Sequence, residues 1–303
     1  MTDEIRDSFF AEGILLSCFF KTMILFSLLF TVPSFSQTKS PSVIYDSDDR
    51  REVLAPDVSQ FSQASKSVAL VVEQAHLNKE KNRYQVLTQP YQQAYKVCSD
   101  EKYSDQPLAG FCTAFLVAPD LLLTAGHCIS NRYECGESAF LFDYIKDSSG
   151  KIKTEFDESE VAFCKELISY KKDFIDYALI RLEKPMARSV LPLTNHPMVE
   201  NTKNLTLIGH PLGLPMKVSP GAAVRTVKEG VFIVNTDSYG GNSGSPVLNE
   251  KQQVVGILVR GEKDFVYDDD KGCNRSKVVN GDEGRGEDVT DVYFLRKIVE
   301  SVK

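Results

Sequence analysis

A seven-residue segment of the sequence, GGNSGSP at 240–246, holds a serine in a setting that suits nucleophilic chemistry. Its glycines permit a tight turn that exposes the Ser243 hydroxyl, where a Cβ atom would block the backbone. The backbone N–H groups of Gly241 and Ser243 can then converge on one point and stabilise a negatively charged oxygen. The neighbours Ser238 and Ser245 lack this glycine frame. Taken alone, the segment is also typical of a plain hairpin turn.

A serine hydroxyl is inert without a base, and a histidine is the usual one. The chain has four histidines. His127 lies in the segment TAGHC (124–128), directly after a predicted strand, and a bond from Cys128 to Cys112 would hold that loop. His210 precedes a proline in a turn and is predicted to be structural. His76 and His196 have no motif around them.

A histidine base needs an acid that orients it. Asp176 begins the apolar segment DYALIRL (176–182), where a buried carboxylate costs several kcal/mol unless it is paired. A histidine Nδ1–H group is a suitable partner. The alternative acid, Asp173, follows two lysines and is expected to be exposed.

The order His127, Asp176, Ser243 is that of the chymotrypsin-like arrangement, not the orders of subtilisin or of the α/β-hydrolases. With TAGHC at 124–128, DYALI at 176–180 and GGNSGSPV at 240–247, residues 65–303 resemble the chymotrypsin/trypsin-like serine peptidases, and most closely the bacterial V8-like (glutamyl endopeptidase) branch. The resemblance implies two packed six-stranded β-barrels with the substrate in the crevice between them. It also implies a disulfide between Cys112 and Cys128.

The resemblance points to four residues for the substrate pocket: Asp237, Ser238, Leu258 and Arg260. In trypsin-like enzymes an aspartate at the position of Asp237 selects Arg or Lys, although bacterial relatives often carry it without that preference. The V8-type histidine that binds glutamate is replaced here by Leu258. Arg260 would supply positive charge to the pocket or neutralise Asp237.

The elements that must position these residues are short β-rich runs. In the first half they lie at 68–72, 113–117, 121–124, 140–144 and 177–182. In the second half they lie at 205–209, 224–227, 231–234, 245–248 and 254–259. Many closely spaced strands predict an all-β fold of antiparallel barrels. One helix is predicted at the C-terminus, with Thr290 or Asp291 as its cap. We expect an N-terminal barrel at 65–188 and a C-terminal barrel at 189–303.

The N-terminus predicts export. A lysine, an apolar run at 23–32 and small residues thereafter are typical of a signal peptide at 1–36. A membrane anchor at 13–32 and a lipoprotein site at Cys18 are the alternatives. Residues 37–64 are predicted to be a leader or pro-segment. Within them, Val43 resembles the mature N-terminus of V8-type enzymes, whose freed amine would order the pocket. The expected location is secreted or periplasmic.

Six cysteines remain after signal removal, an even number that suggests up to three disulfides. Their long, irregular spacings and the lack of a Cys-x-x-Cys pair argue against zinc. Besides Cys112–Cys128 we prefer Cys135–Cys164 and Cys98–Cys273, although the sequence allows three pairings of those four residues.

The composition and charge further limit the partners and functions that we expect for this protein. The net charge of −7 disfavours a nucleic-acid partner. The acid-rich segment at 263–291 is predicted to be a solvated surface loop, with calcium binding as the alternative. We expect a monomer that acts on proteins or peptides, needs no metal or organic cofactor and has no stable membrane association after signal removal. An inactive binding protein on the same fold and an esterase are the rival interpretations; the chain lacks the Gly-x-Ser-x-Gly elbow of the latter.

Overall fold

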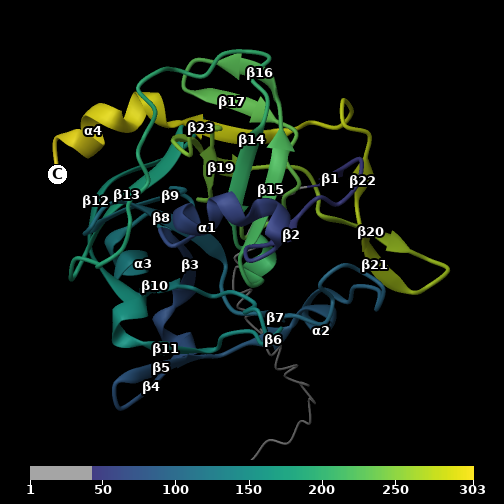
Figure 1. The fold of residues 1–303 in the computed structure, drawn as a ribbon, viewed down its shortest axis with the longest axis horizontal. Helices are drawn as coiled ribbons and strands as arrows, with labels where there is room; N and C mark the ends of the chain where they lie inside the picture. Colours follow the sequence, from purple (N-terminus) through teal and green to yellow (C-terminus); the bar gives the residue numbers. More distant parts are fainter. Residues whose placement is uncertain (1–42) are drawn as a thin grey trace, which may run out of the picture. The chain divides into compact units, whose positions relative to one another are not determined.

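A closed six-stranded antiparallel barrel forms the first half of the described chain (Figure 1). The computed structural model describes residues 43–303, so the predicted signal peptide and the start of the leader lie outside the described residues. The barrel order is β10-β12-β13-β9-β8-β3. Its strands are β3 (Val68–Glu73), β8 (Cys112–Ala118), β9 (Leu121–Thr124), β10 (Ser138–Phe142), β12 (Val161–Lys172) and β13 (Asp176–Leu182).

The second half forms an eight-stranded antiparallel sheet in the order β16-β17-β23-β19-β18-β14-β15-β2. The predicted all-β class is thus confirmed, although this sheet stays open where a second six-stranded barrel was expected. The edge of β15 is taken by β2, which comes from near residue 51, instead of by β16. The strands are β2 (Arg51–Glu52), β14 (Leu205–Gly209), β15 (Lys217–Ala222), β16 (Val224–Lys228), β17 (Val231–Val234), β18 (Pro246–Leu248), β19 (Val254–Arg260) and β23 (Glu287–Asp291).

One hydrophobic cluster joins the barrel to the sheet. Phe115 and Leu123 of the barrel pack in the same cluster as Ile208 and Ile257 of the sheet, and all four are 0% exposed. Every residue of β8 is buried, which is why its sequence, CTAFLVA, reads as an apolar run without alternation. The shared core fixes the barrel loops that follow β9 and β12 against the loops of the sheet.

Shorter elements surround these two sheets. The small strands are β1 (Ile44–Tyr45) with β22 (Val278–Val279), β4 (Leu77–Glu80) and β5 (Arg83–Val86) with β11 (Glu155–Asp157), β6 (Gln89–Pro90) with β7 (Pro107–Leu108), and β20 (Phe265–Asp268) with β21 (Cys273–Ser276). The helices are α1 (Ser62–Ser65), α2 (Tyr91–Tyr95), α3 (Arg132–Gly136) and α4 (Arg296–Glu300). In the described part of the chain, no helix is long and apolar enough to cross a membrane.

Residues 43–64, predicted as part of a leader, pack against the second sheet. Val43 and Ile44 are at most 1% exposed. The segment continues through β2, which pairs with β15, and through a 3-10 helix (Pro56–Phe61) that packs against β15, into α1 (Figure 1). Arg50 is fully buried, donates to the Asp48 carboxylate (Nε–Oδ1 2.9 Å) and stacks 4.1 Å above the Tyr239 ring. The Asp48 contact lies within the segment, so it is the stacking of Arg50 on Tyr239 that ties the segment to the second half of the chain.

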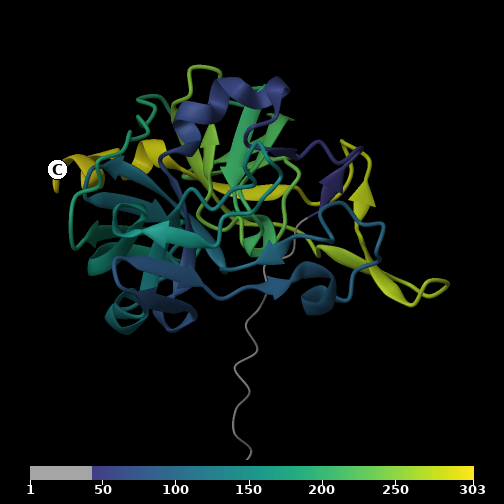
Figure 2. The same ribbon diagram turned by 60° about the horizontal axis from the view of Figure 1, so that its bottom comes forward.

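The acidic segment 263–291 was predicted to be a surface loop, and this is wrong for its last part. The β20–β21 hairpin does project from the body of the fold (Figures 1 and 2). However, β23 is buried along its whole length between β17 and β19. Its acids are tolerated there because they accept hydrogen bonds: Asp291, for example, accepts from Met198 N (2.8 Å) and Tyr293 N (2.9 Å). The second of these bonds caps the C-terminal helical segment, as predicted.

Candidate active site

His127 lies in the turn that follows β9, and that turn is built around a carboxylate. The backbone N–H groups of Gly126 and His127 both donate to Asp176 Oδ1, at 2.6 and 3.1 Å. Gly126 has to be a glycine here, because a Cβ atom would lie 1.8 Å from Lys171 O. The backbone of the turn is therefore bound to Asp176 independently of the imidazole ring.

Asp176 is the first residue of β13 and is 1% exposed. Its second oxygen, Oδ2, lies 2.8 Å from His127 Nδ1. The Thr290 hydroxyl of β23 accepts from Asp176 N (3.1 Å) and donates to Asp176 O (2.9 Å), so the second sheet also fixes this residue. The alternative acid, Asp173, is exposed and makes no described contact with the histidine.

The contact between His127 and Asp176 determines which imidazole nitrogen is available to accept a proton. Because the carboxylate can only accept, Nδ1 carries the hydrogen that faces Asp176. The free Nε2 of a neutral imidazole is then a proton acceptor. With its side chain 32% exposed, His127 can meet a molecule from solvent. A histidine held in this way suits a general base.

Ser243 sits in a turn framed by two glycines in the left-handed region, Gly241 (φ 90°) and Gly244 (φ 90°). A Cβ atom at Gly244 would lie 2.0 Å from Thr113 O, so this position also demands glycine. The turn abuts the histidine loop, since Cys128 Sγ lies 3.7 Å from Ser243 O. The turn that carries Ser243 thus lies beside the histidine loop, at the junction of barrel and sheet.

Two backbone donors beside Ser243 are available to a ligand. Within residues 43–303, the N–H groups of Gly241 and Ser243 donate to no protein group, whereas those of Asn242 and Gly244 donate to Tyr239 O and Leu258 O. N–H groups that are oriented but unused are what the stabilisation of a developing oxyanion requires.

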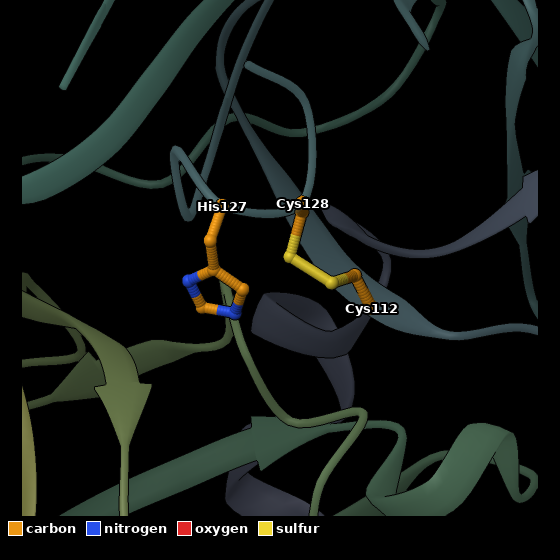
Figure 3. Close-up of side chains that lie close together, drawn as sticks. All are labelled: Cys112, His127 and Cys128. Carbon is orange, nitrogen blue, oxygen red and sulfur yellow. A yellow bond between two sulfur atoms is a disulfide. The ribbon is translucent and has the colours of Figure 1, made fainter. Parts of the chain in front are cut away.

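Three disulfides form, in the pairs that the sequence analysis prefers: Cys112–Cys128, Cys135–Cys164 and Cys98–Cys273. Figure 3 shows the first beside the imidazole of His127. The two sulfurs and one His127 ring nitrogen lie within 4.8 Å of one another. A disulfide offers no thiolate, however, so this cluster does not suit a metal ion.

The four predicted pocket residues have other partners. Both oxygens of Asp237 accept backbone hydrogen bonds, from Tyr45 N (2.7 Å) and Asp49 N (2.8 Å). Ser238 is fully buried, and its hydroxyl accepts from Asn242 Nδ2 at 3.1 Å. Leu258 packs in the core of the second sheet.

Arg260 does not neutralise Asp237. Its Nη2 instead lies 3.5 Å from Oδ2 of Asp176 and donates to the Asp173 carbonyl. The guanidinium thus adds a positive charge at the oxygen that also faces His127.

The carboxyl group of Asp237 is the most perturbed acid near the site. Burial, reinforced by the negative charge of Asp49, raises its pKa to about 7, and Arg50 and the two backbone donors oppose this only in part. The pKa of Asp49 is raised as well, chiefly by burial. Asp49 belongs to the segment that begins at Val43, so this segment and Asp237 of the second half bring two acids with raised pKa values close together.

A raised acid pKa makes stability fall as the pH rises. The folded state holds the Asp237 proton more tightly than the unfolded chain, so this contribution is complete below about pH 4 and is lost as the pH passes 7. We expect Asp49→Asn, which removes the neighbouring charge, to unfold at about the same urea concentration as the wild type at pH 5. At pH 8 it should be more stable, by roughly 1 kcal/mol. Equal urea midpoints at pH 8 would contradict this.

Sequence reasoning missed two residues that hold the site together, Thr113 and Thr290. Thr113 directly follows Cys112, and Thr290 lies in an acidic segment that reads as a loop. A threonine carries no motif of its own, so only the partners of its hydroxyl reveal its role.

Part of this chain is similar in sequence to a known protein family, and its fold is similar to that of solved structures. Residues 112–257 match the family model of the trypsin-like peptidase domain. Among solved structures, a Glu endopeptidase is similar, with 17% identity and a TM-score of 0.49 over 86% of this chain and 100% of that one. The inactive form of Rv3671c from Mycobacterium tuberculosis H37Rv is also similar, with 12% identity and a TM-score of 0.46 over 86% of this chain and 96% of that one. No curated protein sequence matches the chain.

The matched region, 112–257, contains His127, Asp176 and Ser243 together with the turns that hold them. Residues 112–257 are accordingly similar to a trypsin-like peptidase domain, which supports a hydrolase of peptide bonds.

Proposed function

We propose that this protein is a serine endopeptidase that works through His127, Asp176 and Ser243 and an acyl-enzyme intermediate. The observation that carries the proposal is the His127 Nδ1–Asp176 Oδ2 contact of 2.8 Å beside a serine turn with two unused N–H groups. An inactive binding protein would not need both an oriented base and open anion donors.

The reaction follows from these groups. Ser243 Oγ attacks the scissile carbonyl while His127 Nε2 takes its proton, and Asp176 holds the imidazole and stabilises the imidazolium. The carbonyl oxygen, now negative, accepts from the N–H groups of Gly241 and Ser243. His127 then protonates the departing amine. A water molecule, deprotonated by His127, hydrolyses the acyl-enzyme and releases Ser243.

We further propose export and processing before Val43. Three disulfides are typical of an oxidising compartment. Val43 is buried, and its carbonyl accepts from Ser238 N at 3.3 Å, in a region where the resemblance to V8-type enzymes places the substrate pocket. Cleavage at this point would leave a new ammonium group close to Ser238.

Cleavage-site profiling tests the function and the specificity together. The secreted protein, its N-terminus sequenced, would be incubated with a mixed peptide library beside a Ser243→Ala control. Cuts that the control loses establish the peptidase. Cuts after Glu would favour the Val43 amine or Arg260 as the selecting group, and cuts after Arg or Lys would favour Asp237. Absence of any cut by the correctly processed wild type would overturn the proposal.

A further inference from the structure

Thr113 of β8 connects the barrel directly to the serine turn. It is 0% exposed, and all three of its hydrogen-bonding groups are used. Its N–H donates to Ser243 O (2.8 Å), its hydroxyl donates to Gly241 O (3.0 Å), and its carbonyl accepts from the Thr124 hydroxyl (2.6 Å). One residue of the barrel therefore binds two carbonyls of the turn that belongs to the sheet.

The direction of the Thr113 hydroxyl hydrogen follows from a second contact. His210 N donates to Thr113 Oγ1 at 3.0 Å, so this oxygen already accepts a hydrogen bond. Gly241 O has no hydrogen to offer, and the hydroxyl must donate to it. His210 is itself fixed: it is fully buried, its Nδ1 lies 3.0 Å from Leu214 O, and burial lowers its pKa to about 3. The neutral ring does not change charge near neutral pH.

Four consecutive carbonyls of the serine turn are each held by one donor. Gly240 O accepts from Leu212 N, and Asn242 O accepts from Ser245 N at 2.9 Å. The other two, Gly241 O and Ser243 O, accept from Thr113. In a trans peptide the C=O and N–H groups point in opposite directions. The donors on Gly240 O and Asn242 O therefore fix the N–H groups of Gly241 and Ser243. The Thr113 hydroxyl, which donates to Gly241 O, fixes the peptide between these two, and the N–H group of that peptide, Asn242 N, donates to Tyr239 O.

The turn needs this support because its glycines resist rotation weakly. Gly240 and Gly241 are adjacent, and Gly241 adopts a φ of 90° that only glycine reaches easily. Without the hydroxyl of Thr113, Gly241 O would lose the donor that the structure gives it. The peptide between Gly241 and Asn242 would then keep only the bond from Asn242 N to Tyr239 O. Because this peptide links the two that carry the Gly241 and Ser243 N–H groups, its rotation would change the direction of one of these N–H groups relative to the other.

We propose that Thr113 is a positioning residue of the reaction: its side chain fixes the serine turn so that the Gly241 and Ser243 N–H groups converge on the oxyanion. This inference rests on the proposed function, since it assigns those N–H groups their role. It predicts that the Thr113 hydroxyl matters for the chemical step, while substrate binding hardly depends on it.

The test compares Thr113→Val, which keeps the shape and removes the hydroxyl, with Thr113→Ser, which keeps the hydroxyl. We expect Thr113→Val to lower kcat about 10- to 100-fold, less than the loss of a whole oxyanion donor, with KM within about twofold. Thr113→Ser should stay within about threefold of the wild type. Thr236→Val is the matched control, because the Thr236 hydroxyl is buried and has no partner among the described residues. Its kcat should not change.

Two kinetic results would overturn the proposal: a folded Thr113→Val enzyme with normal kcat, or a Thr113→Ser enzyme as slow as Thr113→Val. If Thr113→Val does not fold, Thr113→Ala removes the same hydroxyl and is read in the same way.

Hydrogen exchange separates the failure of this proposal from failure of the proposed function. Thr113→Val, and not Thr113→Ser, should speed amide exchange in the segment 240–245 and at His210, whose N–H group loses its acceptor, and should leave the rest of the chain unchanged. If the wild type cuts no peptide but the two variants differ in exchange in this way, the positioning contact stands and the peptidase function fails. Unchanged exchange in 240–245 would overturn the role of Thr113, whatever the activity.

Discussion

Replacing Ser243 by alanine is expected to lower kcat for peptide hydrolysis by about a millionfold, as removal of the nucleophile does in serine peptidases of this mechanism. The reason is that His127 and the two backbone donors then have no attacking oxygen to act on. Initial-rate assays with a peptide that the wild type cuts would measure the loss.

The neighbouring serine provides the control for this prediction. Ser245→Ala removes a buried hydroxyl whose contact with Asn242 Oδ1 is long, at 3.4 Å. It should retain kcat within about tenfold, since it supplies neither the nucleophile nor an oxyanion donor. If Ser243→Ala kept appreciable activity while Ser245→Ala lost it, the nucleophile would have been assigned to the wrong residue.

Asp176→Asn is expected to lower kcat by about 10⁴-fold with little change in KM. The Gly126 and His127 N–H groups would keep the amide oxygen at the place of Oδ1. The amide NH₂ would then face His127 Nδ1, which must become an acceptor, so the hydrogen moves to Nε2. His127 Nε2 would then already carry a hydrogen and could not accept the proton of the serine hydroxyl.

Asp173→Asn is the matched control for this second prediction. Asp173 is the other acid that the sequence offers, but its side chain is exposed. Steady-state kinetics on both variants, with circular dichroism to check folding, should leave Asp173→Asn close to the wild type. A comparable loss in the two variants would argue that Asp176 acts only through local charge.

The first barrel and the site turns could be predicted from the sequence because each has a strong local cause. The strands 121–124 and 205–209 are apolar runs bounded by turn residues, and their predicted bounds match the structure. Strand β12 was missed since its outer half is exposed and polar. Strand β15 was missed because it contains Pro220 and Gly221 at a bulge opposite β14.

The substrate pocket could not be predicted, for a different reason. Asp237 lies six residues before Ser243 in the sequence, but this spacing does not indicate which groups its carboxylate oxygens bind. Its partners, Tyr45 N and Asp49 N, come from a segment nearly 200 residues away that reads as a polar leader. In the same way, Arg260 reaches Asp176 from another sheet. Such pairings depend on tertiary packing, which a single sequence does not encode in local patterns.

Labelling with a fluorophosphonate tests the central claim most directly, because this probe reacts only with a serine that a base has activated. The wild type should form one adduct, located on Ser243 by peptide mass spectrometry. Both Ser243→Ala and His127→Ala should be unlabelled. A folded, processed wild type that takes up no probe, or one labelled at another residue while Ser243→Ala still cuts peptides, would contradict the account.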